Sequence, residues 1–284
     1  MTYANGQQGR SPRWLHKLST SEVGDYLRDS DTVVVPCGAT EQHGDHLPVG
    51  VDALTAIAVS EAASAKTGVL LTPPLWFGWS PHHMGFPGTV SLRAETLTFV
   101  AEDIALSLVH HGFKRIVFVN GHRLANLPPL AIATSRVRNQ TGAVVVVADL
   151  AHLAQPAYAD AAENHGAAGI GHADGYETAH MMHIHPELVA LDRIADSVSK
   201  TRQVPGTHPS MRTIDPSKAS SRAGWWPSTE DELIAGGSGV SGDPTWGSEE
   251  RGAKLHRAMV EDLLTLLDQV KSAPVDIQRP PSPC

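Results

Sequence analysis

The sequence predicts an α/β protein built around a mainly parallel sheet. Four short apolar runs, rich in β-branched residues, lie at residues 32–36, 69–75, 115–122 and 143–150. Segments of helical length and periodicity separate them. Strands that alternate with helices in this way form βαβ units, and such units give parallel strands.

The first helices are marked by residues that suit their ends. A short helix is expected at 21–27, before the first strand. The helix expected at 51–68 ends at Gly68, which suits a C-terminal cap. The next helix follows Ser91, a candidate N-cap, and ends at Gly112.

Beyond residue 127 the alternation continues and then becomes less regular. A helix is expected at 127–142, and a second helical segment at 174–189 extends to Pro186. Residues 200–250 are rich in Gly, Ser, Pro and Trp, which predicts a long ordered loop. An amphipathic helix at 249–273 closes the chain.

Composition excludes several classes of protein. The chain has 284 residues, 41% of them hydrophobic and 18% charged, which suits one large globular domain or two smaller ones. Its net charge of −8 argues against a nucleic-acid partner or an anionic membrane surface, because either would favour a basic face. No apolar run approaches the length of a membrane span.

The cysteines and the N-terminus predict a reducing compartment. Cys37 and Cys284 are the two cysteines, and they do not make a disulfide framework. The first residues contain no apolar core of a signal peptide. We therefore expect a cytoplasmic location.

Acidic and histidine side chains follow two of the predicted strands. The stretch "VVVPCGATEQHGDHLPVGVDA" carries Glu41, His43 and Asp52, and the third strand leads into Asn120-Gly121-His122. Ligands of open parallel sheets bind beyond the carboxyl ends of the strands, so these loops are expected to meet. Their nitrogen and oxygen donors suit Zn²⁺, Mn²⁺ or Fe²⁺.

Each of these two motifs, taken alone, can also be interpreted as a solvated polar loop. Glu-Gln-His and Asn-Gly-His are both common tripeptides, and only their occurrence at successive strand ends favours a metal site. Asp45 and His46, in the same loop, are expected to face solvent or to lie behind the ligands.

A third cluster, "GHADGYETAHMMHIH", lies near the start of the helical segment at 174–189. His172 and Glu177 stand at the junction of loop and helix, which makes them the better functional candidates. His180 shares a helical face with Glu177. His183 and His185 are expected on a solvated face.

Aromatic residues offer walls for a pocket, or else core and subunit contacts. The candidates in the loop after the second strand are Trp76, Phe77, Trp79, His82 and His83. Those near the closing helix are Trp225, Trp226 and Trp246.

Five motifs occur in an order that resembles one protein family. "GATEQHGDHLPVGVD" is similar to the signature of the creatininase family of metal-dependent amidohydrolases. "FPGTVSL", "VNGH", "GHADGYETAHMMHIHPELV" and "GVSGDPTWGSEERGAKL" follow in the family's order. The resemblance runs from about residue 14 to about residue 270, and its first motif is the most specific.

The resemblance implies a fold, an assembly and a ligand set. The fold would be a three-layer α/β/α domain, here a single domain over 1–284 with loose tails at 1–12 and 274–284. The protein would be a homo-oligomer, often a hexamer, with two divalent metal ions (Zn, Mn or Fe) per chain. The implied metal ligands are Glu41, His43, Asp52 and His122, with Asp52 bridging, and the catalytic candidates are His172 and Glu177.

The chain departs from the family pattern directly after Asn-Gly-His. Creatininase continues His-x-Glu-Asn, whose glutamate is a ligand of the second metal, whereas this sequence has "NGHRLANLPPL". Leu124 cannot bind a metal. The second site must therefore recruit another carboxylate, for which Glu177 is the candidate, or be weak.

The function implied by the resemblance is hydrolysis of a carbon–nitrogen bond in a small cyclic amide, similar to creatinine or a lactam. A metal-activated water would attack the carbonyl, and His172 would give a proton to the leaving nitrogen. Two alternatives keep the fold and the metals, namely a formamide hydrolase and a peptide-trimming hydrolase. A third is a non-catalytic metal-binding oligomer.

Overall fold

The computed structural model describes residues 11–123, 125–154, 157, 171–197 and 237–277. In this part of the chain a five-stranded sheet has the order β1-β3-β2-β4-β5, and every neighbouring pair is parallel. The strands are β1 (Arg13–Trp14), β2 (Thr32–Cys37), β3 (Leu70–Leu71), β4 (Arg115–Asn120) and β5 (Val144–Asp149).

Helices connect and cover the strands. The α-helices of the described residues are α1 (Thr20–Asp29), α2 (Val51–Thr67), α3 (Ala94–His110), α4 (Leu127–Thr141), α5 (Leu150–Leu153), α7 (Gly175–Ile184) and α9 (Glu249–Ser272). Short 3₁₀ helices are η1 (Leu15–Lys17), η2 (Pro81–His83), η4 (Pro186–Leu188), η5 (Leu191–Arg193) and η7 (Pro244–Trp246).

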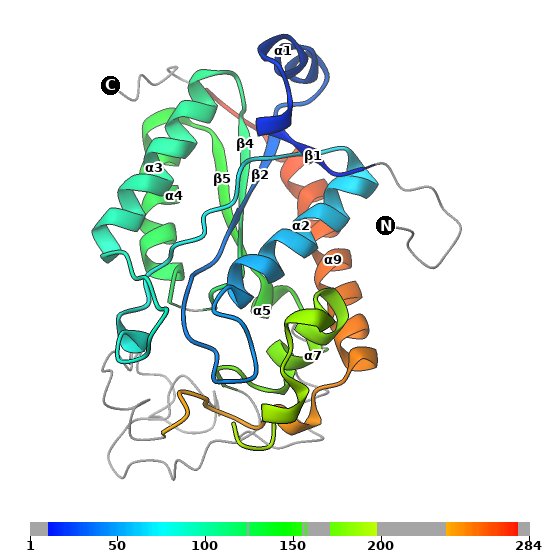
Figure 1. Cartoon of the computed structure of the whole chain (residues 1–284). Coiled ribbons are helices and arrows are strands. Elements are labelled where there is room, and N and C mark those ends of the chain that lie inside the picture. The colour runs from blue at the N-terminus through cyan, green and yellow to red at the C-terminus, as the bar shows by residue number, and fades with distance from the viewer. Residues whose placement is uncertain (1–10, 124, 155–156, 158–170, 198–236, 278–284) are drawn as a thin grey trace, which may run out of the picture.

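The sheet is the middle of three layers (Figure 1). Helices α2 and α9 lie on one face, and α3 and α4 lie on the other. Successive residues of β2 show the alternation, since Val34 packs with α2 and α9 while Val33 and Val35 pack with α3 and α4. The predicted three-layer α/β/α fold with a parallel sheet is confirmed.

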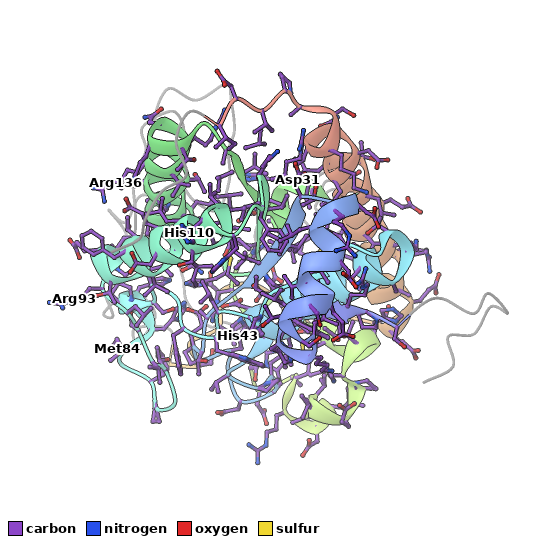
Figure 2. All side chains as sticks on the ribbon, turned by 90° about the horizontal axis from the view of Figure 1, so that it is seen from above. Asp31, His43, Met84, Arg93, His110 and Arg136 are labelled. Atoms are coloured by element: carbon purple, nitrogen blue, oxygen red, sulfur yellow. The ribbon has the colours of Figure 1, made fainter. Side chains whose placement is uncertain are left out.

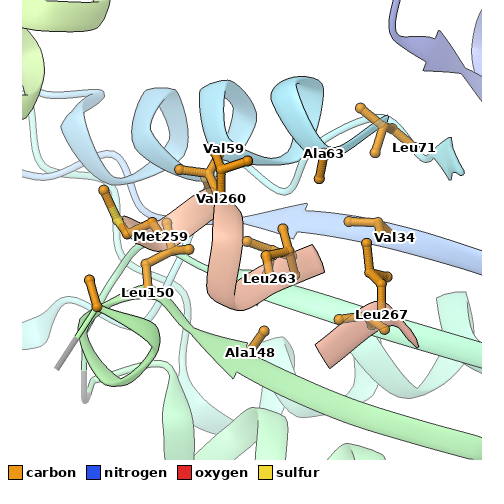
Figure 3. Close-up of a cluster of buried hydrophobic side chains, with 14 of the residues drawn as sticks. Val34, Val59, Ala63, Leu71, Ala148, Leu150, Met259, Val260, Leu263 and Leu267 are labelled. Atoms are coloured by element: carbon orange, nitrogen blue, oxygen red, sulfur yellow. The ribbon is translucent and has the colours of Figure 1, made fainter. Parts of the chain in front are cut away.

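The long closing helix supplies much of one core. Met259, Leu263 and Leu267 of α9 lie against Val59 of α2 and Val34 of β2 (Figure 3). Leu263 and Leu267 are fully buried. Truncating either to alanine removes about 2–5 kcal/mol of stability, as is typical for buried leucines.

The second strand of the prediction, 69–75, is much shorter than expected. Only Leu70 and Leu71 form ladder pairs with β2, because Pro73 and Pro74 have no N–H to donate. The chain nevertheless stays beside β2, where Leu75 N donates to Pro36 O over 2.9 Å.

Other boundaries also differ from the sequence prediction. The N-cap of α3 is Arg93, and the Ser91 hydroxyl instead accepts a hydrogen bond from Ser80 N. The two-residue strand β1 and the single turn α5 were not predicted, since both are too short to show a periodicity. Helix α7 ends at Ile184, two residues before Pro186.

Some expectations fall at the edges of the described chain. The C-terminal segment keeps contact with the domain as far as Ile277, which packs against the cluster of α3 and α4. Most of the loop expected at 200–250, the outer parts of both tails and Leu124 lie outside the described residues. No helix in the described ranges has the length and apolarity that a membrane span needs.

The strand order sets the position of the polar loops. The chain leaves β2 for β3 on one side and returns to β4 on the other, so the carboxyl ends of β2 and β4 flank a topological switch point. Cys37 and Asn120, the last residues of these strands, are paired in register. The loops that carry Glu41 and His122 therefore start side by side.

Candidate metal centre

Two glycines let the strand ends approach the first turn of α2. A Cβ on Gly121 would lie 2.0 Å from the Asp52 carbonyl oxygen, and a Cβ on Gly38 would lie 2.3 Å from the Ala53 nitrogen. No side chain fits at either place. This close approach puts Asp52 between the two loops.

The first group of candidate ligands contains Glu41, Asp52 and His122. His122 Nδ1 lies 3.3 Å from Glu41 Oε1 and 3.1 Å from Asp52 Oδ2. Its Nε2 lies 3.2 Å from both Trp79 O and Ser80 Oγ. A proton on Nε2 satisfies the Trp79 carbonyl, which leaves the Nδ1 lone pair directed at the carboxylates.

The second group contains His43, Asp52 and Glu177. His43 Nε2 lies 3.5 Å from Asp52 Oδ1 and 3.6 Å from Glu177 Oε2. Its Nδ1 lies 3.1 Å from the backbone oxygen of Glu41, which fixes the proton on that side. The Nε2 lone pair is therefore the one that faces the carboxylates.

Asp52 belongs to both groups and offers one oxygen to each. Within each group the ligand atoms lie within 4.8 Å of one another. Three of the atoms, Glu41 Oε2, His43 Nε2 and Asp52 Oδ2, are buried and have no hydrogen-bond partner in the described part of the chain. Unpaired buried donors and acceptors are costly, and a divalent cation would satisfy them, so the residues fit a metal site.

The electrostatics of the centre favour positive charge. Burial opposes a charge on His43, but Asp52 and Glu177 outweigh it and raise the pKa of the ring to about 9. The same balance, through Glu41 and Asp52, raises the pKa of His122 well above its ordinary value. Burial raises the pKa of Glu41. Carboxylates this concentrated and this buried require cations, whether protons or metal ions.

His172 lies beside the first group. Its Nδ1 is 3.6 Å from Glu41 Oε1, and its Nε2 lies 2.6 Å from Gln42 O. The Gln42 carbonyl holds the proton on Nε2, so Nδ1 faces the centre as an acceptor. Burial, with His43 adding to it, lowers the pKa of His172 well below its ordinary value, so the ring is neutral at neutral pH.

His83 has the opposite tautomer. The Gln42 amide is oriented by Gly44 N, which donates to its oxygen, so its nitrogen donates to both Gly239 O and His83 Nδ1. The remaining proton of His83 is then on Nε2, 3.5 Å from Glu41 Oε2. His83 therefore presents a donor to the centre rather than a ligand lone pair.

Gln42 and His83 could not be assigned from the sequence. His83 was expected only as part of a pocket wall, and Gln42 as a loop residue. Their roles depend on contacts that span 41 residues of sequence in one case and 197 in the other. Asn126 was similarly missed, although its side chain ties Gly38 O and Asn120 Oδ1 together behind the centre.

Glu177 extends from the first turn of α7 toward the centre, where it lies near His43 and forms an ion pair with Arg123. The Arg123 guanidinium lies 3.4 Å from Glu177 Oε1 and also donates to Gly171 O. Asp174 caps α7 by accepting from the backbone nitrogens of Tyr176 and Glu177. Glu177, the carboxylate that the sequence analysis suggested for the second site, therefore lies next to both His43 and the Arg123 cation.

Two further histidines, His46 and His180, make their hydrogen bonds away from the carboxylates of the centre. Asp45 is exposed, as expected, whereas His46 is buried and its Nε2 lies 3.0 Å from Thr178 Oγ1. His180 is buried against His256. Figure 2 shows His43 within the packed side chains, while Met84 and Arg93 lie at the periphery.

The aromatic residues divide between surface and core. Trp76 and Phe77 are exposed, whereas Trp246 is buried and packs edge-on against Tyr176. Trp246 is thus a core residue, which was the alternative to a pocket cover. Trp225 and Trp226 lie outside the described residues.

The fold and this cluster together define a class: α/β proteins with a centre of histidines and carboxylates at the carboxyl edge of a parallel sheet. The family model of creatininase, described as creatinine amidohydrolase, matches residues 16–267. The chain belongs to the creatininase family. The site-bearing loops all lie within the matched range.

Curated relatives have several activities. A creatinine amidohydrolase of Pseudomonas putida is 31% identical over 74% of this chain and 88% of the relative. A mycofactocin precursor peptide peptidase of Mycobacterium ulcerans is 30% identical over 88% of this chain and 90% of the relative. A 3-dehydro-scyllo-inosose hydrolase of Thermotoga maritima is 26% identical, over 66% of this chain and 61% of that longer protein.

Solved structures agree with the fold. A crystal structure of creatinine amidohydrolase is similar to this chain with a TM-score of 0.76 and 26% identity, covering 93% of this chain and 99% of that one. Other creatininase structures, one described with Mn and one of a Zn-Zn type, are each 24% identical to this chain and support the fold alone.

Proposed function

We propose that this protein is a metal-dependent hydrolase that cleaves the carbon–nitrogen bond of a small cyclic amide. The observation that carries the proposal is Asp52, whose two oxygens serve two groups of candidate ligands. Each group contains a histidine whose other ring nitrogen is held by a backbone oxygen. Such an arrangement suits two divalent ions of Zn, Mn or Fe that share one carboxylate.

The residues proposed as metal ligands are Glu41, His43, Asp52, His122 and Glu177. When bound there, divalent ions supply an acidic water and polarise a substrate carbonyl. The protein's own contribution is to hold the five side chains in one cluster, four of them buried, and to orient each ring by a second hydrogen bond.

His172 is the proposed proton carrier. With Nε2–H on Gln42 O, its Nδ1 can accept a proton from an attacking water and later release it to the leaving nitrogen. Its position next to Glu41 Oε1 keeps this exchange at the edge of the ligand cluster. His83 Nε2 lies 3.5 Å from Glu41 Oε2, close to the carboxylate but without a hydrogen bond to it.

A peptide-trimming hydrolase is the second candidate function. It is favoured by the Mycobacterium ulcerans relative, which is a peptide peptidase that matches nearly the whole of this chain. Both candidates use the same centre, since both cleave an amide. They differ in the size of the substrate that the site must admit. Measuring turnover of creatinine, lactams, cyclic imides, formamides and short peptides would distinguish the two functions.

The proposal is tested by Glu41→Ala and His122→Ala, compared with the exposed control Asp45→Ala. Glu41→Ala and His122→Ala each remove a proposed metal ligand from the first group. Metal content, measured by elemental analysis, and turnover of any amide should therefore both fall below the wild-type values. The circular dichroism spectrum should stay that of the folded protein. Full activity in either variant would refute the mechanism.

Three broader expectations accompany this proposal. The chain is expected to be one domain, to act on a small molecule in the cytoplasm, and to assemble as a homo-oligomer such as a hexamer. The formamide hydrolase and the non-catalytic metal-binding oligomer remain alternatives in the same panel, the latter marked by metal binding without hydrolysis.

A further inference from the structure

Arg123 puts a guanidinium next to one of the two groups of candidate ligands. Its Nη2 lies 3.4 Å from Glu177 Oε1 and 3.9 Å from Asp174 Oδ2, and it donates to Gly171 O. The side chain is 17% exposed, so these contacts are largely shielded from solvent. Arg123 thereby links the turn after β4 to the turn that carries Glu177.

The two oxygens of Glu177 face different partners. Oε2 accepts a hydrogen bond of 2.6 Å from Ala173 N and lies 3.6 Å from His43 Nε2. Oε1 faces Arg123. Ala173 has a φ of +53°, an uncommon conformation for a residue with a side chain, and this turn directs its N–H at Glu177.

The first group has no such partner. Within the described residues, the ion pairs of Glu41 and Asp52 are all made with histidines, namely His43, His83, His122 and His172. A metal ion at Glu41, Asp52 and His122 would thus meet two carboxylates that no permanent cation shares. A metal ion at His43, Asp52 and Glu177 would meet one carboxylate already paired with a guanidinium.

We propose that Arg123 is a fixed cation of the centre that makes its two metal positions unequal. The position at Glu41, Asp52 and His122 binds tightly, and the position at His43, Asp52 and Glu177 binds weakly and exchanges its ion. The inference rests on the proposed metal-dependent function and adds a hierarchy to it. Its physical basis is the repulsion between a dication and a guanidinium that share one carboxylate.

The test is a calorimetric titration of the metal-free full chain with Mn²⁺ alone, and then with Zn²⁺ alone, with bound metal counted by elemental analysis. The wild type should bind one ion tightly and a second at higher free metal. In Arg123→Gln the second step should tighten by about tenfold or more, since one unit of like charge is removed a few ångströms away. The first step should not change.

Two further variants separate charge from structure. Arg123→Lys keeps the positive charge and should retain the weak second step. Arg136→Gln removes a half-exposed charge of α4 that pairs with Glu102, and it should bind both ions as the wild type does. If Arg123→Gln loosens the turn, the unchanged first step still reports a folded centre.

Equal affinity for both ions in the wild type would overturn the inference. So would a second step that stays the same or weakens in Arg123→Gln, because Arg123 would then only support Glu177. Failure of the proposed function would look different: the first step itself would be missing, or ions would bind without any amide hydrolysis.

Discussion

Two histidine clusters in this protein differ in the groups that face them. In the candidate metal centre, His43 and His122 lie within 3.6 Å of carboxylate oxygens. In the second cluster, between α7 and α9, His180 Nε2 lies 3.0 Å from His256 Nδ1, and His180 Nδ1 lies 3.3 Å from the Thr55 hydroxyl. No carboxylate takes part in those hydrogen bonds.

The pKa values of His43 and His122 shift in the opposite direction to those of His180 and His256. Burial, together with neighbouring histidines, lowers the pKa of His180 well below its ordinary value, and burial lowers that of His256 to about 4. Carboxylates reverse the effect of burial at His43 and His122. Histidine-rich sequence is therefore not enough for a cation site, and the carboxylates decide where a cation is held.

The largest effect on metal binding is expected for Asp52→Asn. Asp52 faces both histidines of the centre, so its loss should weaken metal binding at both positions by about a hundredfold or more, given that even indirect partners of metal ligands contribute about ten- to a hundredfold. Metal content after dialysis and amide turnover should both collapse. Asp45→Asn, an exposed neutralisation seven residues earlier, is the matched control. Stoichiometric metal in Asp52→Asn would show that the shared carboxylate is dispensable.

A smaller effect is expected from His256→Gln in the second cluster. The folded-state pKa of His256, about 4, is below its unfolded value, so the unfolded chain binds more protons as pH falls. Stability that is present above about pH 6.5 is therefore lost progressively toward pH 4. Glutamine keeps a hydrogen bond to His180 but does not titrate. Between pH 7 and pH 5 the variant should therefore lose about 2 kcal/mol less stability than the wild type.

The measurement is urea unfolding at a series of pH values. The variant keeps the other charged and titratable neighbours of the cluster. His183, Lys66 and Arg257 disfavour a charge on His256, and Glu249 favours a charge on His183. His111→Gln, at an exposed position beyond α3, is the control for a surface histidine. If the free energy of unfolding of His256→Gln depended on pH as that of the wild type does, the lowered pKa of His256 would not contribute to the pH dependence of stability.

The sequence predicts one half of the candidate metal centre better than the other. Glu41, His43 and Asp52 follow one strand and His122 follows the other, and the rule that ligands bind beyond strand ends brings these loops together. His172 and Glu177 stand out in the sequence by their position where a loop meets a helix, but the periodicity of that segment does not encode its place in the fold. The family resemblance was needed to bring them to the centre. The Arg123–Glu177 pair depends on that same tertiary placement.

Prolines and short elements account for the misplaced boundaries. Pro73 and Pro74 interrupt the ladder of β3 although the run around them is apolar, and β1 has only two residues. The tautomers of His43, His83 and His172 depend on backbone oxygens and on one glutamine amide, which no spacing in the sequence reveals. The general layers were predictable because helix and strand periodicities are local, whereas these hydrogen bonds are not.

The finest test of the comparison lies within the ligand loop itself, at His46. It is three residues from His43 and equally buried, but its Nε2 contacts the Thr178 hydroxyl, and burial lowers its pKa to about 4. If contact with carboxylates is what makes a ligand, His46→Gln should keep full metal content and lose about 1 kcal/mol of stability through the altered hydrogen bond. His43→Gln should lose the ion at the second position. If His46→Gln lost as much metal as His43→Gln, binding would depend on the conformation of the loop rather than on the carboxylates that face each ring.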